Sequence, residues 1–142
     1  MAVEVTSGVL AKLLAEADRA APEECCGLLL GRGEPGREGR IDAMQPAANV
    51  SDAPRVRFEI DPAVLLAAHK AARAGGPRVL GYYHSHPEGH PVPSATDCEH
   101  STGDLRIWAI IGKGQVAFWR DSGKGFSELT FRTVGEDRAV QS

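Results

Sequence analysis

The segment from residue 83 to residue 97, YHSHPEGHPVPSATD, carries the side chains with the clearest chemical meaning in this sequence. His84 and His86 are two positions apart, and at the end of a strand that spacing places both imidazoles on the same face. Two neutral imidazoles side by side are a good start for a divalent metal site. The loop that follows contains three prolines and a glycine, so it is constrained and can return Asp97 as a third ligand.

Three protein ligands indicate a catalytic metal rather than a structural one. Structural zinc sites usually close with four protein ligands, often including cysteine, whereas three ligands leave one position for water. Zinc lowers the pKa of bound water from 15.7 to ~7 and so generates a nucleophile at neutral pH. A general base is then required. Because the sequence contains no H-E-x-x-H helix, that base has to come from elsewhere in the chain.

Several of these residues also have simpler structural explanations. Ser94 and Asp97 fit the start of a helix, with Ser94 as the N-cap and Asp97 in the first turn. Such a cap is compatible with metal binding, because it would hold Asp97 in place. The two histidines could be an exposed or satisfied pair on a strand. His90 could be a fourth ligand, but a solvated or substrate-facing side chain is the favoured interpretation.

The cysteines are interpreted as structural. Cys98 and His100 flank Asp97 and could suggest a second metal set. In a helix, however, Cys98 points ~100° away from Asp97, so we expect a small buried thiol and a surface histidine. Cys25 and Cys26 are expected in the core rather than as nucleophiles. The odd number of cysteines predicts no disulfide framework.

Two distant segments of the chain resemble a known family. The run HSHP at residues 84–87, followed by Ser94 and Asp97, reproduces the H-S-H-x7-S-x2-D pattern of the JAMM (MPN+) zinc metalloproteases. The run PEECCGLLLG at residues 22–31 looks like the P-x-E-x-C-G-x-L-x-G element of the same family. The resemblance covers residues 5–131 in the expected order, and a pattern in two separate segments is far more specific than an H-x-H pair alone.

The resemblance implies a role for each matching residue. His84, His86 and Asp97 match the zinc ligands, with one zinc ion per chain. Glu24 matches the general acid/base that acts on the metal-bound water, and Ser94 matches the residue that hydrogen-bonds the tetrahedral oxyanion. The implied fold is α+β, a mixed α/β sandwich of the cytidine-deaminase-like MPN type. Its central sheet is mostly antiparallel and flanked by helices.

The implied activity is hydrolysis of amide or isopeptide bonds, often after the C-terminal glycine of a ubiquitin-like protein. In free-standing bacterial members the substrates can be β-grasp sulfur carriers. We therefore expect the substrate to be the C-terminal Gly-Gly tail of a ubiquitin-like or sulfur-carrier protein. The tail is expected to enter a groove by pairing with an edge strand, with Val92 and the neighbouring prolines as one wall.

Two other classes of function stay open at the level of the sequence. A non-catalytic MPN scaffold that binds a protein partner typically loses zinc ligands, whereas this sequence retains all three. A zinc hydrolase or deaminase acting on a small molecule is suggested by the fold family, but the P-C-x-x-C pair of deaminases is absent. A G-x-G-x-x-G pattern begins at Gly31, but Pro35 interrupts it. We therefore interpret it as a hairpin loop rather than a nucleotide site.

Hydropathy patterning predicts the elements that position these residues. One helix is expected to be capped by Thr6 or Ser7 and ended by Pro22. A second follows Asp61 over residues 62–73, and a short third helix begins at Ser94. Strands are expected at residues 2–5, 25–30, 41–49, 55–60, 79–84, 105–111, 116–119 and 126–131. Together these elements predict a sheet covered by two helices.

Length and composition limit the remaining possibilities. At ~150 residues per domain, the 142 residues form one domain. We assign residues 1–134 to it and residues 135–142 to a polar tail. The net charge of −3 gives no electrostatic reason to bind nucleic acid. No apolar run approaches the ~20 residues that span a bilayer, and no signal peptide is evident. A cytoplasmic protein is expected, and its oligomeric state stays open.

Overall fold

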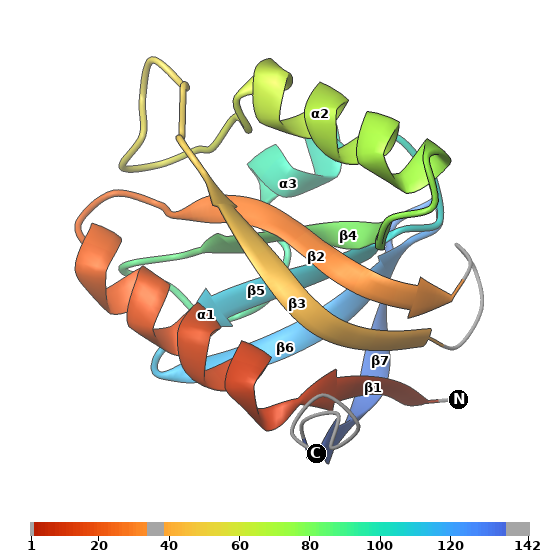
Figure 1. Ribbon diagram of the computed structural model, residues 1–142. Coiled ribbons are helices and arrows are strands. Elements are labelled where there is room, and N and C mark those ends of the chain that lie inside the picture. Colours follow the sequence, from red (N-terminus) through yellow and green to blue (C-terminus); the bar gives the residue numbers. More distant parts are fainter. Residues whose placement is uncertain (1, 34–38, 136–142) are drawn as a thin grey trace.

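The strands pair into one sheet that closes on itself (Figure 1). The computed structural model describes residues 2–33 and 39–135. Within them the sheet order is β1-β3-β2-β4-β5-β6-β7. The strands are β1 (Ala2–Thr6), β2 (Cys26–Gly33), β3 (Gly39–Ala47), β4 (Arg78–Ser85), β5 (Ile107–Gly112), β6 (Gln115–Asp121) and β7 (Phe126–Val134). The helices are α1 (Ser7–Ala20), α2 (Pro62–Arg73) and α3 (Ala95–Glu99).

The first strand, β1, closes the barrel because it is hydrogen-bonded on both edges. It pairs in parallel with β7 over its whole length and with β3 at two positions. The pairs β2–β3, β2–β4, β5–β6 and β6–β7 are antiparallel, whereas β4–β5 is parallel. The sheet is therefore mostly antiparallel, which confirms the expected α+β class.

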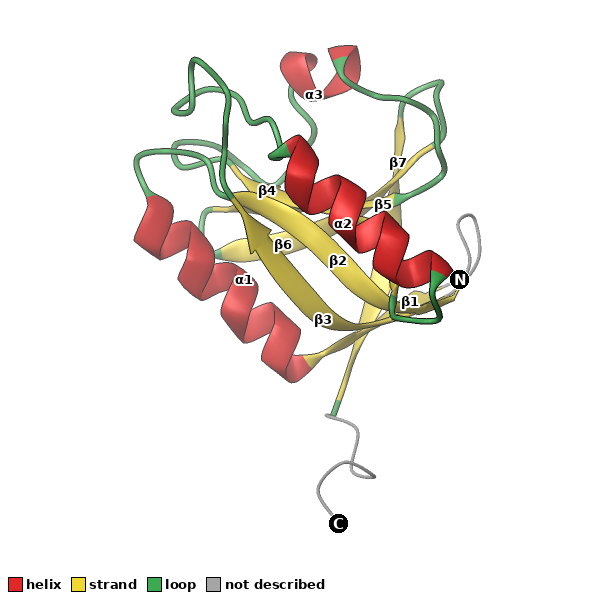
Figure 2. Cartoon of the chain, turned by 45° about the horizontal axis from the view of Figure 1, so that its top comes forward, coloured by secondary structure: helices red, strands yellow, loops and turns green. Residues whose placement is uncertain are grey.

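The two longer helices pack against different faces of the sheet and lie apart from each other (Figure 2). Val9 and Leu13 of α1 belong to the main core, together with Leu29 of β2. Ala68 of α2 instead packs against Leu28 on the opposite face of β2, in a second cluster. Successive side chains of a strand point to opposite faces, so β2 contributes to both clusters.

Local sequence signals set the helix boundaries. The Thr6 side chain accepts a hydrogen bond from the Val9 N–H, and α1 ends at Ala20, two residues before Pro22. The Asp61 side chain accepts from the Ala63 N–H at the start of α2. The observed bounds of α2 are those predicted. Among the described residues, no helix is both long and apolar enough to cross a membrane.

One expected strand is wrong. Residues 55–60 form a loop in which only Ile60 makes an isolated bridge, with Asn49. The Val56 and Arg57 N–H groups donate to the Ala53 carbonyl and so form a turn, and Val56 is 66% exposed. Among the described residues, no strand pairs with this alternating segment, and only its last residues bond to the main chain of residues 48–50.

Two expectations fall partly or wholly outside the described residues. The hairpin loop interpreted from the glycine-rich pattern includes residues 34–38, which are not described. The strands on either side of it do pair antiparallel, up to Gly33 and Gly39. The polar tail after residue 135 also lies outside the described residues.

Candidate metal centre and active site

Three ligand-type side chains converge at the carboxyl end of β4. His84 Nε2 lies 3.1 Å from His86 Nε2 and 3.1 Å from the Asp97 carboxylate, and His86 Nε2 lies 3.2 Å from the same carboxylate. His84 and Asp97 are buried and His86 is half-buried. Within residues 2–33 and 39–135, these three form the cluster that could hold a metal ion. The structure therefore brings together the three ligands expected from the sequence.

The spacing of these atoms fits a tetrahedral zinc site. With zinc–ligand bonds of ~2.0–2.1 Å, neighbouring ligand atoms of a tetrahedron lie ~3.3 Å apart, close to the 3.1–3.2 Å found here. His86 Nδ1 donates to the His90 carbonyl at 2.9 Å, so Nε2, which faces the cluster, is the nitrogen that would bind a metal ion. Three protein ligands also leave a fourth position open, as in catalytic zinc sites.

Burial and mutual hydrogen bonding set the protonation of the cluster. Burial would raise the pKa of Asp97, but hydrogen bonds from His84 and His86 hold that pKa well below its usual range. Complete burial lowers the pKa of His84 despite the nearby Asp97 carboxylate. His84 is therefore neutral, the form that binds metals. Burial also acts to lower the pKa of His86, but Asp97 and the His90 carbonyl outweigh it and the net pKa is raised.

Asp97 is held by a helix cap. The Ser94 Oγ accepts from the Asp97 N–H at 3.0 Å, and the Ser94 N–H donates to Asp97 Oδ2 at 2.9 Å. This reciprocal arrangement is a capping box at the start of α3. Asp97 is thus both a cap residue and a member of the cluster. Because the cap uses the Ser94 oxygen as an acceptor, its O–H is left to donate toward a substrate.

Glu24 lies beside this cluster. Its side chain is buried, whereas Glu23 is exposed. Burial raises the pKa of Glu24 to about 7, the His86 charge acts to lower that pKa, and the Asp97 charge acts to raise it. A carboxyl group with a pKa near neutrality is well matched to accept and release protons at physiological pH.

The loop of residues 49–60 makes two contacts with the site that the sequence did not predict. The Phe58 ring stacks on His84, with 4.3 Å between ring centroids and 17° between planes. The Asn49 Nδ2 donates to the Glu24 carbonyl at 3.0 Å. The strand that the sequence predicts over residues 55–60 gives no reason to place Phe58 against a histidine. Asn49 itself was the available signal, because asparagine is typical of turns and disfavoured within strands.

The other candidate residues lie outside the cluster. The His90 side chain is exposed and contributes only its carbonyl, to His86. Cys98 is exposed, so the buried thiol expected there is wrong: in the short helix α3 the inward position belongs to Asp97. His100 is exposed and Cys26 is buried, both as expected. Burial raises the pKa of the Cys26 thiol to about 12, so the thiol is protonated at neutral pH and a poor nucleophile.

One hollow borders the metal cluster, and a second is lined by Phe58, the ring that stacks on His84. One, of about 180 Å³, is lined by His86 and Pro87 together with residues of α1 and of the β5–β6 turn. The other, of about 240 Å³, is lined by Phe58, Tyr82 and Trp108 among others. Val92 lines a third hollow, against β6 and β7, which contains none of the cluster residues. Val92 is connected to the ligands through His90, whose carbonyl accepts from the Val92 N–H at 2.8 Å and from His86 Nδ1 at 2.9 Å, so its place as a wall of the substrate groove stays a prediction.

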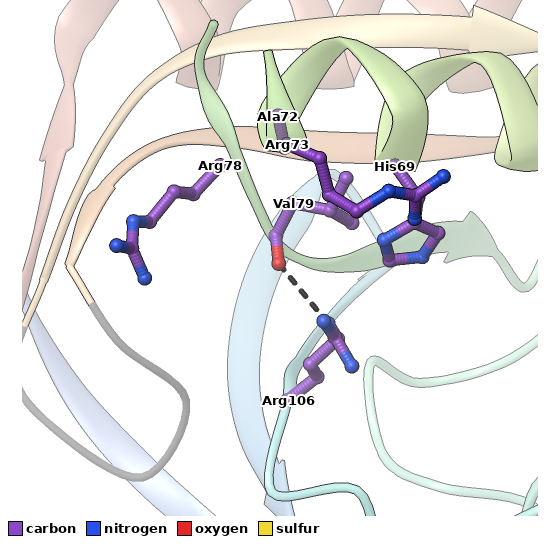
Figure 3. A pocket seen from close by; sticks show the side chains of 6 residues that line it. All are labelled: His69, Ala72, Arg73, Arg78, Val79 and Arg106. Carbon is purple, nitrogen blue, oxygen red and sulfur yellow. Dashed lines mark hydrogen bonds between the residues drawn. The ribbon is translucent and has the colours of Figure 1, made fainter. Parts of the chain in front are cut away.

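A separate basic hollow lies at the opposite end of β4 (Figure 3). It measures about 400 Å³ and is lined by His69, Ala72, Arg73, Arg78, Val79 and Arg106. The Arg106 Nε donates to the Val79 carbonyl at 3.0 Å. Arg78 begins β4 and His84 lies six residues further along. At ~3.3 Å per residue the two are ~20 Å apart, so this hollow is not part of the metal centre.

Comparisons with known proteins agree with this geometry. A model of prokaryotic homologues of the JAB domain (Prok-JAB) matches residues 6–122. The chain is 32% identical over 131 residues to a desampylase of Haloferax volcanii, covering 92% of each protein. It is 36% identical over 97 residues to a Thermus thermophilus protein named "Probable TtuB-protein conjugate cleaving protease". That match covers 68% of this chain and 62% of the relative.

Solved structures show the same architecture. A solution structure of a Desulfitobacterium hafniense protein superposes with a TM-score of 0.81 at 27% identity, over 99% of this chain and 98% of that one. A JAB1/MPN domain protein from Archaeoglobus fulgidus superposes with a TM-score of 0.57 at 20% identity, over 92% and 97% of the two chains. With a family model that spans most of its length, this chain belongs to the prokaryotic JAB family, the free-standing branch of the JAB/MPN proteins.

Proposed function

We propose that this protein is a zinc-dependent isopeptidase that cleaves after the C-terminal Gly-Gly of a ubiquitin-like or sulfur-carrier protein. The observation that carries the proposal is the convergence of His84, His86 and Asp97 with a buried Glu24 beside them. The relatives support the reaction class, since one is named a desampylase and another a protease that cleaves protein conjugates.

The mechanism assigns each group a separate task. A zinc ion held by His84, His86 and Asp97 would supply Lewis acidity toward the scissile carbonyl and lower the pKa of water. Glu24 accepts the proton of the attacking water and passes it to the leaving amine, for which a pKa of about 7 is suitable. The Ser94 hydroxyl donates to the oxyanion of the tetrahedral intermediate.

Access to the cluster limits how a substrate tail can bind. Strand β4 is paired with β2 on one edge and with β5 on the other, so a tail cannot extend the sheet there as an added strand. The hollow lined by His86 borders the cluster, and Phe58, which stacks on His84, lines a second hollow. A tail with no side chains at its end can pass between such walls, which favours glycine at the scissile bond.

The test is a panel of β-grasp carrier proteins that end in Gly-Gly followed by a short extension or an isopeptide-linked lysine peptide. Products are identified by mass spectrometry, with and without chelator and after zinc is added back. We expect cleavage directly after Gly-Gly that stops with chelator and returns with zinc. Cleavage that persists in chelator would contradict the zinc mechanism. Equal cleavage of unfolded peptides of arbitrary sequence would indicate a general peptidase instead.

A further inference from the structure

We propose that Asn49 is a positioning residue that holds Glu24 at the angle needed for proton transfer. Asn49 lies just after β3 and belongs to none of the motifs that define the site. The inference rests on the proposed role of Glu24 as proton acceptor, and the experiment below separates the two.

Glu24 is not held by the sheet. Strand β2 begins two residues later, at Cys26, so the main-chain groups of Glu24 need partners from another part of the chain. Its N–H donates to the Pro54 carbonyl at 2.7 Å. Its carbonyl accepts from Asn49 Nδ2 at 3.0 Å. Both main-chain groups of Glu24 are therefore bound by the loop of residues 49–60, and the backbone angles that direct its carboxyl depend on that loop.

Asn49 in turn gives the loop its shape. Besides Glu24, its Nδ2 donates to the Arg57 carbonyl at 3.1 Å. Its Oδ1 accepts from the N–H groups of Ser51, at 3.1 Å, and Glu59, at 3.0 Å. The side chain thus acts as donor and acceptor to both arms of the loop. An amide offers both functions, whereas a carboxylate is an acceptor only and alanine offers neither.

The same loop also contacts the metal cluster. Phe58, next to the residues that Asn49 binds, stacks on the ring of His84. The loop therefore bridges the proton acceptor and the first ligand, and Asn49 is the residue that holds its two arms together. A displacement of ~1 Å in a catalytic group can cost ~10²-fold in rate, so a loop that only relaxes, without unfolding, is expected to reduce turnover.

The experiment compares Asn49→Ala and Asn49→Asp with Ser51→Ala as the matched control. Asn49→Asp keeps the acceptor for Ser51 and Glu59 but places an oxygen against the Glu24 carbonyl. The Ser51 hydroxyl accepts from the Ala53 N–H in the same loop and does not contact Glu24. We expect both Asn49 variants to lose ~10–10²-fold in kcat, with KM and zinc content unchanged, while Ser51→Ala keeps wild-type turnover.

A second measurement needs no turnover. Amide hydrogen exchange of the metal-free proteins, followed by NMR, reports the Glu24 N–H directly. We expect it to exchange at least ~10-fold faster in both Asn49 variants than in wild type or Ser51→Ala. If Asn49→Ala does not fold, the test of the inference rests on Asn49→Asp alone. Unchanged Glu24 exchange, or wild-type kcat in Asn49→Asp, overturns the inference. Wild-type kcat in Glu24→Gln would instead overturn the proposed role of Glu24.

Discussion

Cys26 of β2 lies directly opposite His84 of β4 in the antiparallel ladder. Two residues back from Cys26 and two forward from His84, the same register sets Glu24 against His86, on the same face of the sheet. The register continues past the end of the ladder, because the Cys25 N–H donates to Ser85 Oγ at 2.8 Å and the Ser85 N–H donates to the Cys25 carbonyl at 3.2 Å. Strand register therefore places Glu24 opposite His86, and the loop of residues 49–60 binds its main-chain groups there.

The first prediction concerns metal content. Purified protein is expected to contain close to one zinc ion per chain, and Asp97→Ala is expected to lose it, because two imidazoles alone do not complete the set. Cys98→Ala is the matched control, since the neighbouring thiol is exposed and outside the cluster. Elemental analysis measures the zinc content of each variant, and competition with a chromogenic chelator measures its zinc affinity. Full zinc affinity in Asp97→Ala would reduce Asp97 to a helix cap.

The second prediction separates two adjacent carboxyl groups. Glu24→Gln is expected to fold, bind zinc and lose ~10²–10⁴-fold in turnover, because the amide keeps the shape but cannot accept a proton. Glu23→Gln is expected to behave like wild type, because Glu23 is exposed. Steady-state hydrolysis of a Gly-Gly extended carrier gives the comparison. The opposite ranking of the two variants would show that the base is assigned to the wrong residue.

The third prediction concerns the pH dependence of stability in metal-free protein. Burial raises the pKa of Glu24 from 4.5 to about 7, so folding favours the protonated form. The resulting stability is fully present below pH 4.5 and is lost as the pH rises through 7. Relative to Glu24→Gln, wild type should lose ~2–3 kcal/mol of unfolding free energy across that range. Urea unfolding in the presence of chelator, from pH 4.5 to 8, measures the difference in unfolding free energy between wild type and Glu24→Gln. A difference that stays constant with pH would contradict the burial of the Glu24 carboxyl group.

The sequence was sufficient where local chemistry decides the structure. The bounds of α2 follow from Asp61 and Pro62 at its start and the glycine-rich turn after it. The capping box at Ser94 and the shared face of His84 and His86 depend on spacings of three and two residues. Such signals act within one turn of helix or one strand, so a single sequence is enough to detect them.

The sequence was insufficient where partners are distant along the chain. Residues 55–60 alternate like a strand, but no strand of the described residues pairs with them, and hydrogen bonds with Asn49 hold them in a loop instead. The closure of the barrel by β1 depends on pairing with β7, more than 120 residues away. The exposure of Cys98 depends on which side of a five-residue helix faces the cluster, which no periodicity reveals in so short a segment.

The fourth prediction tests Ser94 in its two roles. Ser94→Ala removes the side-chain cap, which is expected to lower stability by ~1 kcal/mol. It also removes the proposed oxyanion donor, which is expected to lower kcat by ~10²–10³-fold. Its main-chain N–H still holds Asp97, so zinc content is expected to stay at the wild-type level. Ser94→Thr keeps a hydroxyl group for both roles and should recover most of the turnover. If Ser94→Ala loses stability but keeps wild-type kcat, Ser94 is only a cap.

The last prediction concerns the residue before the scissile glycine. His86 of the cluster lines one hollow, Phe58 against His84 lines another, and β4 is paired on both edges there. A side chain on the last residues of the tail would therefore meet a wall, whereas glycine has none. Changing the penultimate glycine of a carrier to leucine should cost more turnover than the same change directly after the scissile bond. Mass spectrometry of matched carriers measures both rates. Equal tolerance at the two positions would place specificity in the folded body of the carrier rather than in its tail.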